Sequence, residues 1–290
     1  MGSAYLINLA FNGVILGLIV ALAALSITLV FGIARFPNAA TGDVATVGAF
    51  AGLAVTATGG GTAAILGFGV LTAAGLSLLF YLILFRGLAD KPPVASLIAS
   101  IGLAFFVRAV LTFFVGHNQQ VYPLPIVRAV PFGPLRVQPT DLQVIAVAVL
   151  ALAAVFALLH LTAIGRRMRA VADNPDLARA SGIAATRVLV VMWLCAGALA
   201  GVSGTLLGIK TVVSPEMGWD LLMPAFAATI LGTIGNPVGA VLGGLLIGLA
   251  QELSTPIVGF TYKIGVGFLV LLLMLLVRPQ GLFAGNALVR

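Results

Sequence analysis

The amino-acid sequence predicts an all-α protein that crosses a membrane many times, a polytopic transmembrane helical bundle. Hydrophobic residues make up 61% of its 290 residues and charged residues only 8%, whereas about a quarter of the residues in a soluble domain are charged. Apolar runs of at least about 18 residues recur along the chain, which is the length that a membrane helix needs. Since no polar stretch is long enough to bury a core of its own, we expect one transmembrane domain over residues 1–290.

Short polar stretches divide the chain into about eight or nine membrane segments, which include short broken or re-entrant helices. We place them at 5–32, 43–58, 63–85, 95–115, 141–161, 188–209, 221–235, 237–254 and 263–277. Segment 221–235 is shorter than the roughly 20 residues of a full crossing. Two alternatives therefore stay open for it: a half-helix that enters the membrane and stops, or a crossing that leaves the C-terminus inside.

The loop 163–187 is the most polar part of the chain and sets the expected orientation. Five of the 15 Lys and Arg residues lie in this loop, namely Arg166, Arg167, Arg169, Arg179 and Arg187. Short basic loops belong on the cytoplasmic side, which places the N-terminus outside. The loop 116–140 is then external, and its prolines argue against a regular helix there. These are Pro123, Pro125, Pro131, Pro134 and Pro139.

The same basic loop contains the signals of a short helix over 174–182. Asn174 suits the N-cap, Pro175 the first position and Asp176 the first turn, and Gly182 suits the residue after the end. A preformed helix on a cytoplasmic loop indicates a docking element for a soluble partner. Leu177 and Ile183 are the expected apolar contacts to that partner.

Two short segments interrupted by glycine resemble each other, one at 38–50 and one at 225–236. Corresponding broken segments in two halves of a transporter point to a pathway at the membrane midplane, although small residues also serve close helix packing. The candidate pathway residues are Asn12, Asn38, Thr41, Gly42, Asp43, Phe226, Thr229, Gly232 and Gly235.

Ionisable residues inside the membrane segments are few. Asp43, Arg108 and Glu252 are the candidates, and we expect Arg108 to extend to the membrane surface or to pair with an acid such as Asp141. Glu216 and Asp220 form an outer pair that either meets a cationic group or is a solvated loop. An ion-coupled carrier usually keeps more buried carboxylates than this, so that class is disfavoured.

Residues that would hydrolyse ATP or bind a metal are missing from the sequence. The stretch 204–211 fails the spacing of a phosphate-binding loop, and the two histidines, His117 and His160, form no catalytic or metal-binding set. Dispersed charges without aromatic platforms disfavour nucleic acid as a partner. We therefore expect no enzyme activity and no cofactor in this chain, and an energy source that lies in another subunit.

The chain resembles the LivH-like permeases of branched-chain amino acid ABC importers over nearly its full length. Four motifs in the family's order carry the resemblance: Asn38-Ala39-Ala40-Thr41-Gly42-Asp43, Gly165-Arg166-Arg167-Met168-Arg169, Gly232-Thr233-Ile234-Gly235-Asn236-Pro237 and Arg278-Pro279-Gln280-Gly281-Leu282-Phe283. The second resembles the ATPase-coupling loop. Its coupling residues would be Arg166, Arg169, Asn174, Pro175, Asp176, Leu177, Arg179, Gly182 and Ile183.

The resemblance implies a multi-pass permease of the bacterial inner membrane, in contact with lipid. Its partners would be a second, related permease, two ATPase subunits that bind ATP and Mg²⁺, and a periplasmic solute-binding protein. Ala39 and Thr41 depart from the family pattern beside the expected pathway, so amides, urea and small organic acids stay open as solutes. A simple-sugar permease of the same superfamily is the other alternative.

Overall fold

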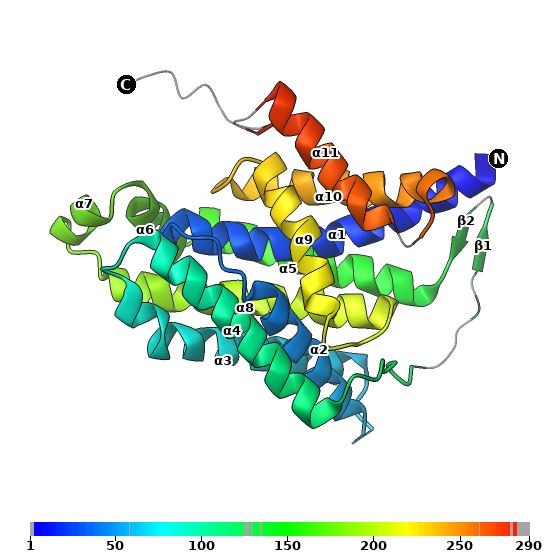
Figure 1. Ribbon diagram of the computed structural model, residues 1–290, viewed down its shortest axis with the longest axis horizontal. Helices are drawn as coiled ribbons and strands as arrows, with labels where there is room; N and C mark the ends of the chain where they lie inside the picture. The colour runs from blue at the N-terminus through cyan, green and yellow to red at the C-terminus, as the bar shows by residue number, and fades with distance from the viewer. Residues whose placement is uncertain are drawn as a thin grey trace.

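The computed structural model describes residues 3–57, 59–124, 128, 130–133, 135–260, 262–278 and 281–282, and it is almost entirely helical (Figure 1). Pro125, Pro134, Pro279, Gln280 and Phe283 lie outside the described residues. The elements are α1 (Ser3–Ala34), α2 (Thr41–Thr56), α3 (Thr62–Ile83), the 3₁₀ turn η1 (Phe85–Leu88), α4 (Pro93–Val115), β1 (Val130–Phe132), β2 (Leu135–Val137), α5 (Pro139–Leu161), α6 (Ala163–Asp173), α7 (Pro175–Ala180), α8 (Ala185–Lys210), α9 (Met217–Leu231), α10 (Pro237–Val258) and α11 (Lys263–Val277).

The predicted fold class is confirmed. Six described helices, α1, α3, α4, α5, α8 and α10, are long and apolar enough to cross a membrane, and α2, α9 and α11 are shorter apolar helices. The expected segment 221–235 is α9, which begins four residues earlier, at Met217, and ends at Leu231. Its 15 residues rise about 22 Å, less than the roughly 30 Å of the hydrocarbon core.

Helices α1 and α8 form the centre of the bundle. Helix α1 is apolar on every side and packs against α5, α8, α9 and α10, while α8 packs against α2 and α3. Glycines permit the closest crossings: a Cβ at Gly244 would collide with the backbone of Ala21, and one at Gly204 with the backbone of Ala45. The small residues spaced four apart therefore serve helix packing.

The bundle has two ends that differ in structure (Figure 1). At one, which we call the α6 end, α6 and α7 lie beside the C-terminal end of α1, and Arg35 Nη2 donates to Ala172 O at 3.3 Å. At the other, the hairpin end, the antiparallel hairpin β1–β2 lies by the N-terminal part of α1, where Arg136 N donates to Asn8 Oδ1 at 3.0 Å. The described part of the loop 116–140 consists of this hairpin and a segment of irregular backbone. It contains no helix before Pro139, where α5 begins.

Helix α9 crosses the middle of the bundle at a steep angle to α1 (Figure 1). Before it, Val213 pairs with Gln120 in a bridge at the hairpin end. After it, Asn236 shares a cavity with Asp173 of α6. The C-terminal segment returns to the α6 end, because Leu282 N donates to Leu231 O at 2.9 Å. Whether 221–235 counts as a crossing stays a prediction, because α9 belongs to the shorter apolar helices.

Candidate functional site

The basic loop 163–187 contains two helices, whereas the sequence analysis expected one. Helix α6 was missed: Thr162 Oγ1 caps it by accepting from Gly165 N at 3.1 Å, and Arg169 donates to Leu159 O. Its Met168 and Val171 are buried against the bundle. The apolar spacing of Ile164, Met168 and Val171 after a capping Thr is the signal that could have identified it.

Helix α7 has the caps that its sequence predicts. Asn174 Oδ1 accepts from Asp176 N at 3.1 Å and from Leu177 N at 3.0 Å. Gly182 has φ +78°, which ends the helix in the left-handed conformation that glycine adopts without strain. Among the described elements, α6 and α8 are its main packing partners. The helix projects from the α6 end (Figure 1).

The two expected docking residues of this loop differ in exposure. The Leu177 side chain is 63% exposed at the tip of α7. Ile183 is half-buried and packs against the hydrophobic core. Leu177 is thus available to a partner, and Ile183 anchors the loop to the bundle. Of the basic coupling candidates, Arg166, Arg169 and Arg179 are exposed.

The two short helices α2 and α9 meet near their N-termini, where Gly42 and Gly218 are so close that a Cβ on either would overlap the other's backbone. Around this crossing most predicted pathway residues are buried and bonded to the chain itself. Thr41 Oγ1 donates to Asn38 O at 3.0 Å, and Thr229 Oγ1 donates to Ala225 O at 2.8 Å. Both bonds go to a carbonyl three or four residues earlier, so they satisfy the hydroxyls locally.

The remaining pathway candidates are either less buried or lie away from the α2–α9 crossing. Asn12 and Phe226 are half-buried. Gly232 is packed on Gly239, and Gly235, with φ +85°, lies in the α9–α10 turn next to Gly32 at the α6 end. The open side of α9 is a stripe with spacing four, three and four, which we call the α9 stripe: Trp219, Met223, Phe226 and Ile230.

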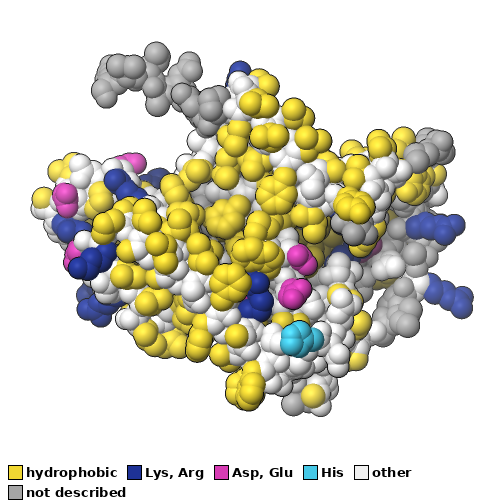
Figure 2. Space-filling model, viewed as in Figure 1, with side chains coloured by type: hydrophobic (Ala, Val, Ile, Leu, Met, Phe, Trp, Pro, Cys, Tyr) yellow, Lys and Arg dark blue, Asp and Glu magenta, His cyan; other side chains and the backbone are white. Residues whose placement is uncertain are grey.

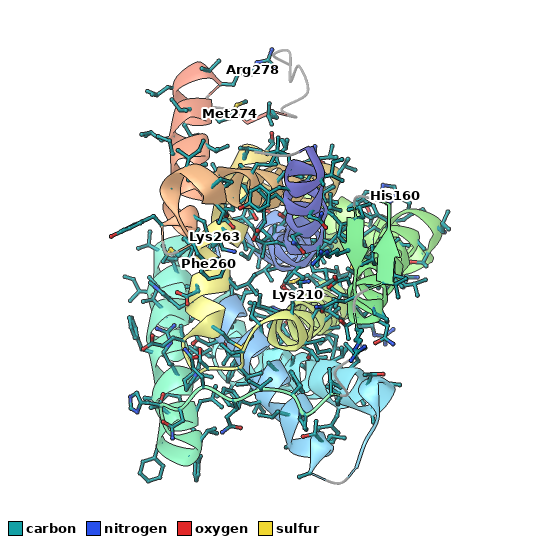
Figure 3. The ribbon with its side chains drawn as sticks, turned by 90° about the vertical axis from the view of Figure 1, so that its right-hand side faces the viewer. His160, Lys210, Phe260, Lys263, Met274 and Arg278 are labelled. Carbon is teal, nitrogen blue, oxygen red and sulfur yellow. The ribbon has the colours of Figure 1, made fainter. Side chains whose placement is uncertain are left out.

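Arg108 pairs with Asp43, which corrects the expectation that named Asp141. Its Nε and Nη2 donate to the two carboxylate oxygens of Asp43 at 3.1 and 3.2 Å, and Asp43 is fully buried. The guanidinium also lies 5.0 Å from the ring centre of Trp219. Asp141 pairs instead with Lys210 of α8 (labelled in Figure 3). The pairing joins α4 to α2 and α9.

The sequence holds a signal for this contact that was missed. Ser96, Ser100 and Ala104 are buried at intervals of four along α4, and Arg108 continues the series. A row of small and polar residues at this spacing marks the face that a membrane helix turns to the bundle. The row predicts where Arg108 points, but its partner can be identified only from the fold.

Charged groups interrupt an apolar surface beside this pair. Figure 2 shows blue and magenta groups set among yellow ones on the face where α4 and α9 lie. Glu216 and Asp220 are exposed there, and within the described part of the chain neither side chain forms an ion pair. The described residues contain no group of three or more His, Cys, Asp or Glu side chains that could hold a metal.

Comparisons with known proteins agree with the geometry. A family model described as "Branched-chain amino acid transport system / permease component" matches residues 9–277. The high-affinity branched-chain amino acid transport system permease protein LivH of Salmonella typhimurium is 30% identical over 96% of this chain and 95% of its own. The ribose import permease protein RbsC of Bacillus subtilis is 35% identical over only 46% and 44%. A chain of PsaBC from Streptococcus pneumoniae in complex with Fab has a TM-score of 0.51 at 13% identity, covers 95% and 92%, and supports the fold alone.

Proposed function

The chain belongs to the permease family of branched-chain amino acid transport systems, and on this basis we propose that it is the permease subunit of a binding-protein-dependent ABC importer in a bacterial inner membrane. Its solute is a branched-chain amino acid or a related small polar compound. Two permeases, two ATPase subunits that bind ATP and Mg²⁺, and a periplasmic binding protein make the working unit. The observation that carries the proposal is the capped, projecting α7.

The α6 end is the cytoplasmic side in this proposal. Basic residues gather there: Arg35, Arg86, Lys91, Arg166, Arg167, Arg169, Arg179, Arg187 and Arg278. Lys and Arg are in excess on cytoplasmic loops. This orientation presents α7 to ATPase subunits and the hairpin end to the binding protein.

Leu177 is the proposed contact between this chain and the ATPase. Its apolar side chain is 63% exposed on a capped helix, so it can insert into an apolar groove of a partner. ATP binding closes the ATPase pair and moves α7. Helix α6 transmits the movement because it contacts α1, α5 and α8, and the ATP-bound partner thereby favours one of two states of the bundle.

The α9 stripe is the proposed wall of the solute pathway. It is apolar, it crosses the middle of the bundle, and Arg108 and Asp220 lie at its start. Polar groups at membrane depth face the interior of a bundle or a water-filled cavity. An apolar wall suits an aliphatic side chain better than a sugar, and RbsC matches less than half of this chain.

Uptake of radiolabelled L-leucine into proteoliposomes that hold the whole importer tests the proposal. We expect uptake that needs both ATP and the binding protein. Leu177→Asp should reduce it at least tenfold while ATP hydrolysis continues, whereas Leu177→Met should transport normally because the contact stays apolar. Equal uptake by the two variants would show that α7 does not couple the subunits.

A further inference from the structure

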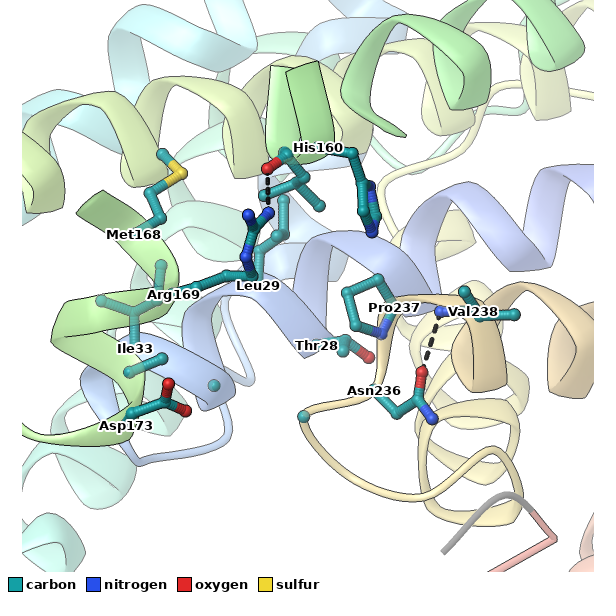
Figure 4. Close-up of a pocket in the computed structure, with 14 residues that line it drawn as sticks. Thr28, Leu29, Ile33, His160, Met168, Arg169, Asp173, Asn236, Pro237 and Val238 are labelled. Carbon is teal, nitrogen blue, oxygen red and sulfur yellow. Dashed lines mark hydrogen bonds between the residues drawn. The ribbon is translucent and has the colours of Figure 1, made fainter. Parts of the chain in front are cut away.

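A cavity of about 310 Å³ lies at the α6 end, between α1, the end of α5, α6 and the α9–α10 turn (Figure 4). We call it the α6 cavity. Leu29 and Ile33 of α1 and Met168 of α6 supply apolar walls. Arg169, Asp173 and Asn236 supply polar groups to the same cavity. Gly235, one of the predicted pathway residues, lines this cavity, but no residue of α2 and none of the α9 stripe does, so the cavity is separate from the α9 stripe.

Thr28 lines this cavity with a hydroxyl that has no partner. The residue is 1% exposed, and its Oγ1 forms no hydrogen bond. A helical Thr usually donates to the carbonyl four residues earlier, which here is Ala24 O, but the Thr28 hydroxyl forms no such bond. In Figure 4 the hydroxyl points to the side of Asn236 and Pro237. A buried donor of this kind is costly until something bonds to it.

The groups around Thr28 supply positive and negative charge on different sides of the cavity. Asn236 Oδ1 caps α10 through Val238 N at 3.1 Å and Gly239 N at 3.1 Å, which leaves its amide NH₂ as a donor. The N-terminus of the 22-residue α10 favours an anion there. The carboxylate of Asp173, on α6, favours a cation, and the guanidinium of Arg169 on the same helix donates to Leu159 O. A place for an anion, a place for a cation and an apolar wall together match the zwitterion of an aliphatic amino acid.

We propose that the α6 cavity binds a free aliphatic α-amino acid from the cytoplasmic side. Its carboxylate accepts from the Thr28 hydroxyl and the Asn236 amide, its ammonium group donates to Asp173, and its side chain contacts Leu29, Ile33 and Met168. The bound amino acid connects α6 to the α9–α10 turn and so resists the movement that α7 transmits. Transport therefore slows as the imported amino acid accumulates inside. This inference rests on the proposed function, which supplies the solute class.

The first experiment measures L-leucine binding to the purified permease–ATPase complex in lipid nanodiscs, without binding protein. We expect Thr28→Val to lower the affinity about tenfold, the effect of losing one hydrogen bond to a charged group. The hydroxyl has no partner in the chain, so this variant should fold normally. Thr205→Val is the matched control, because Thr205 Oγ1 is also buried and unpartnered but lies in the α3–α8 contact beside Gly69.

A second variant tests the orientation of the ligand. Asp173→Asn should weaken the binding of L-leucine but not that of 4-methylpentanoate, since that compound lacks only the amino group that Asp173 would accept from. Equal leucine affinity in Thr28→Val and Thr205→Val, or no saturable binding in the wild type, would overturn the inference.

Uptake assays separate this inference from the function on which it rests. With L-leucine loaded inside the proteoliposomes, wild-type uptake should slow and Thr28→Val uptake should slow much less. Inhibition of both to the same extent would contradict the role in regulation. A wild-type importer that takes up no leucine from empty vesicles would instead overturn the proposed function, and the inference with it.

Discussion

The two ends of the bundle use their charged residues differently. Away from the α6 end, three ion pairs each join two helices: Lys210–Asp141 joins α8 to α5 and Lys263–Glu252 joins α11 to α10 at the hairpin end, and Arg108–Asp43 joins α4 to α2 deeper in the bundle. Lys263 also lies 4.2 Å from the ring centre of Phe260 (Figure 3). At the α6 end, the ion pair found among the described residues, Arg179–Asp176, lies within α7, with its side chains 65% and 92% exposed.

This contrast separates structural charge from charge left for a partner. The ion pairs between helices link neighbouring helices of a bundle that is otherwise apolar. At the α6 end, Arg35 donates to backbone carbonyls at the end of α6, and most other basic side chains point to solvent. That end is therefore the one that we propose to bind another subunit.

The largest effect is expected from Arg108→Ala. The change leaves the Asp43 carboxylate buried without a partner, which should lower the free energy of unfolding by about 3 kcal/mol or more. Thermal unfolding of the purified protein measures this. The double variant Asp43→Asn/Arg108→Ala removes the buried charge as well and should be more stable than the single variant. If the single variant proves the more stable of the two, the pair does not bear on stability as described.

A smaller loss is expected from Lys210→Met. Asp141 keeps a second stabilising contact, because its Oδ2 accepts from Gln138 N at 3.4 Å at the positive end of α5. We expect a loss of about 1–2 kcal/mol, measured in the same unfolding assay. A loss as large as that of Arg108→Ala would mean that the cap contributes nothing.

At the α6 end, Asn174→Ala should act locally. Loss of the N-cap costs about 1 kcal/mol, but α7 makes few contacts with the bundle, so global unfolding should change little. Hydrogen exchange should rise in the amides of Asp176 and Leu177, which Asn174 caps. Unchanged exchange there, or a global loss of stability, would show that α7 is held by more than its cap.

The smallest effect is expected from Arg179→Ala. An exposed pair within one helix contributes well under about 1 kcal/mol, so the unfolding temperature should not change measurably. A clear decrease would remove the distinction between the two ends. Lys263→Ala at the hairpin end is the comparison, because its pair with Glu252 is only 16% and 14% exposed and its loss should be measurable.

The accuracy of the sequence analysis depended on how local each signal was. The caps of α7 involve residues within a few positions of one another, and Asn174, Pro175 and Gly182 behave as predicted. The partner of Arg108 lies 65 positions away along the chain, and no local pattern distinguishes Asp43 from Asp141. The polar residues Asn38 and Thr41 are buried within this chain, and their place in the pathway stays a prediction.

By itself, the sequence determined the class of this protein: a membrane bundle, its nine apolar segments, its basic loop and the capped helix within it. These follow from the solvation of apolar runs and from backbone hydrogen bonds over a few residues, both of which are local. Only the tertiary structure decided which charges pair, which side of α9 stays open and where the unpartnered hydroxyl of Thr28 meets a cavity. Those outcomes depend on how helices distant in sequence pack, because a buried polar group finds its partner, or lacks one, only after the bundle has closed around it.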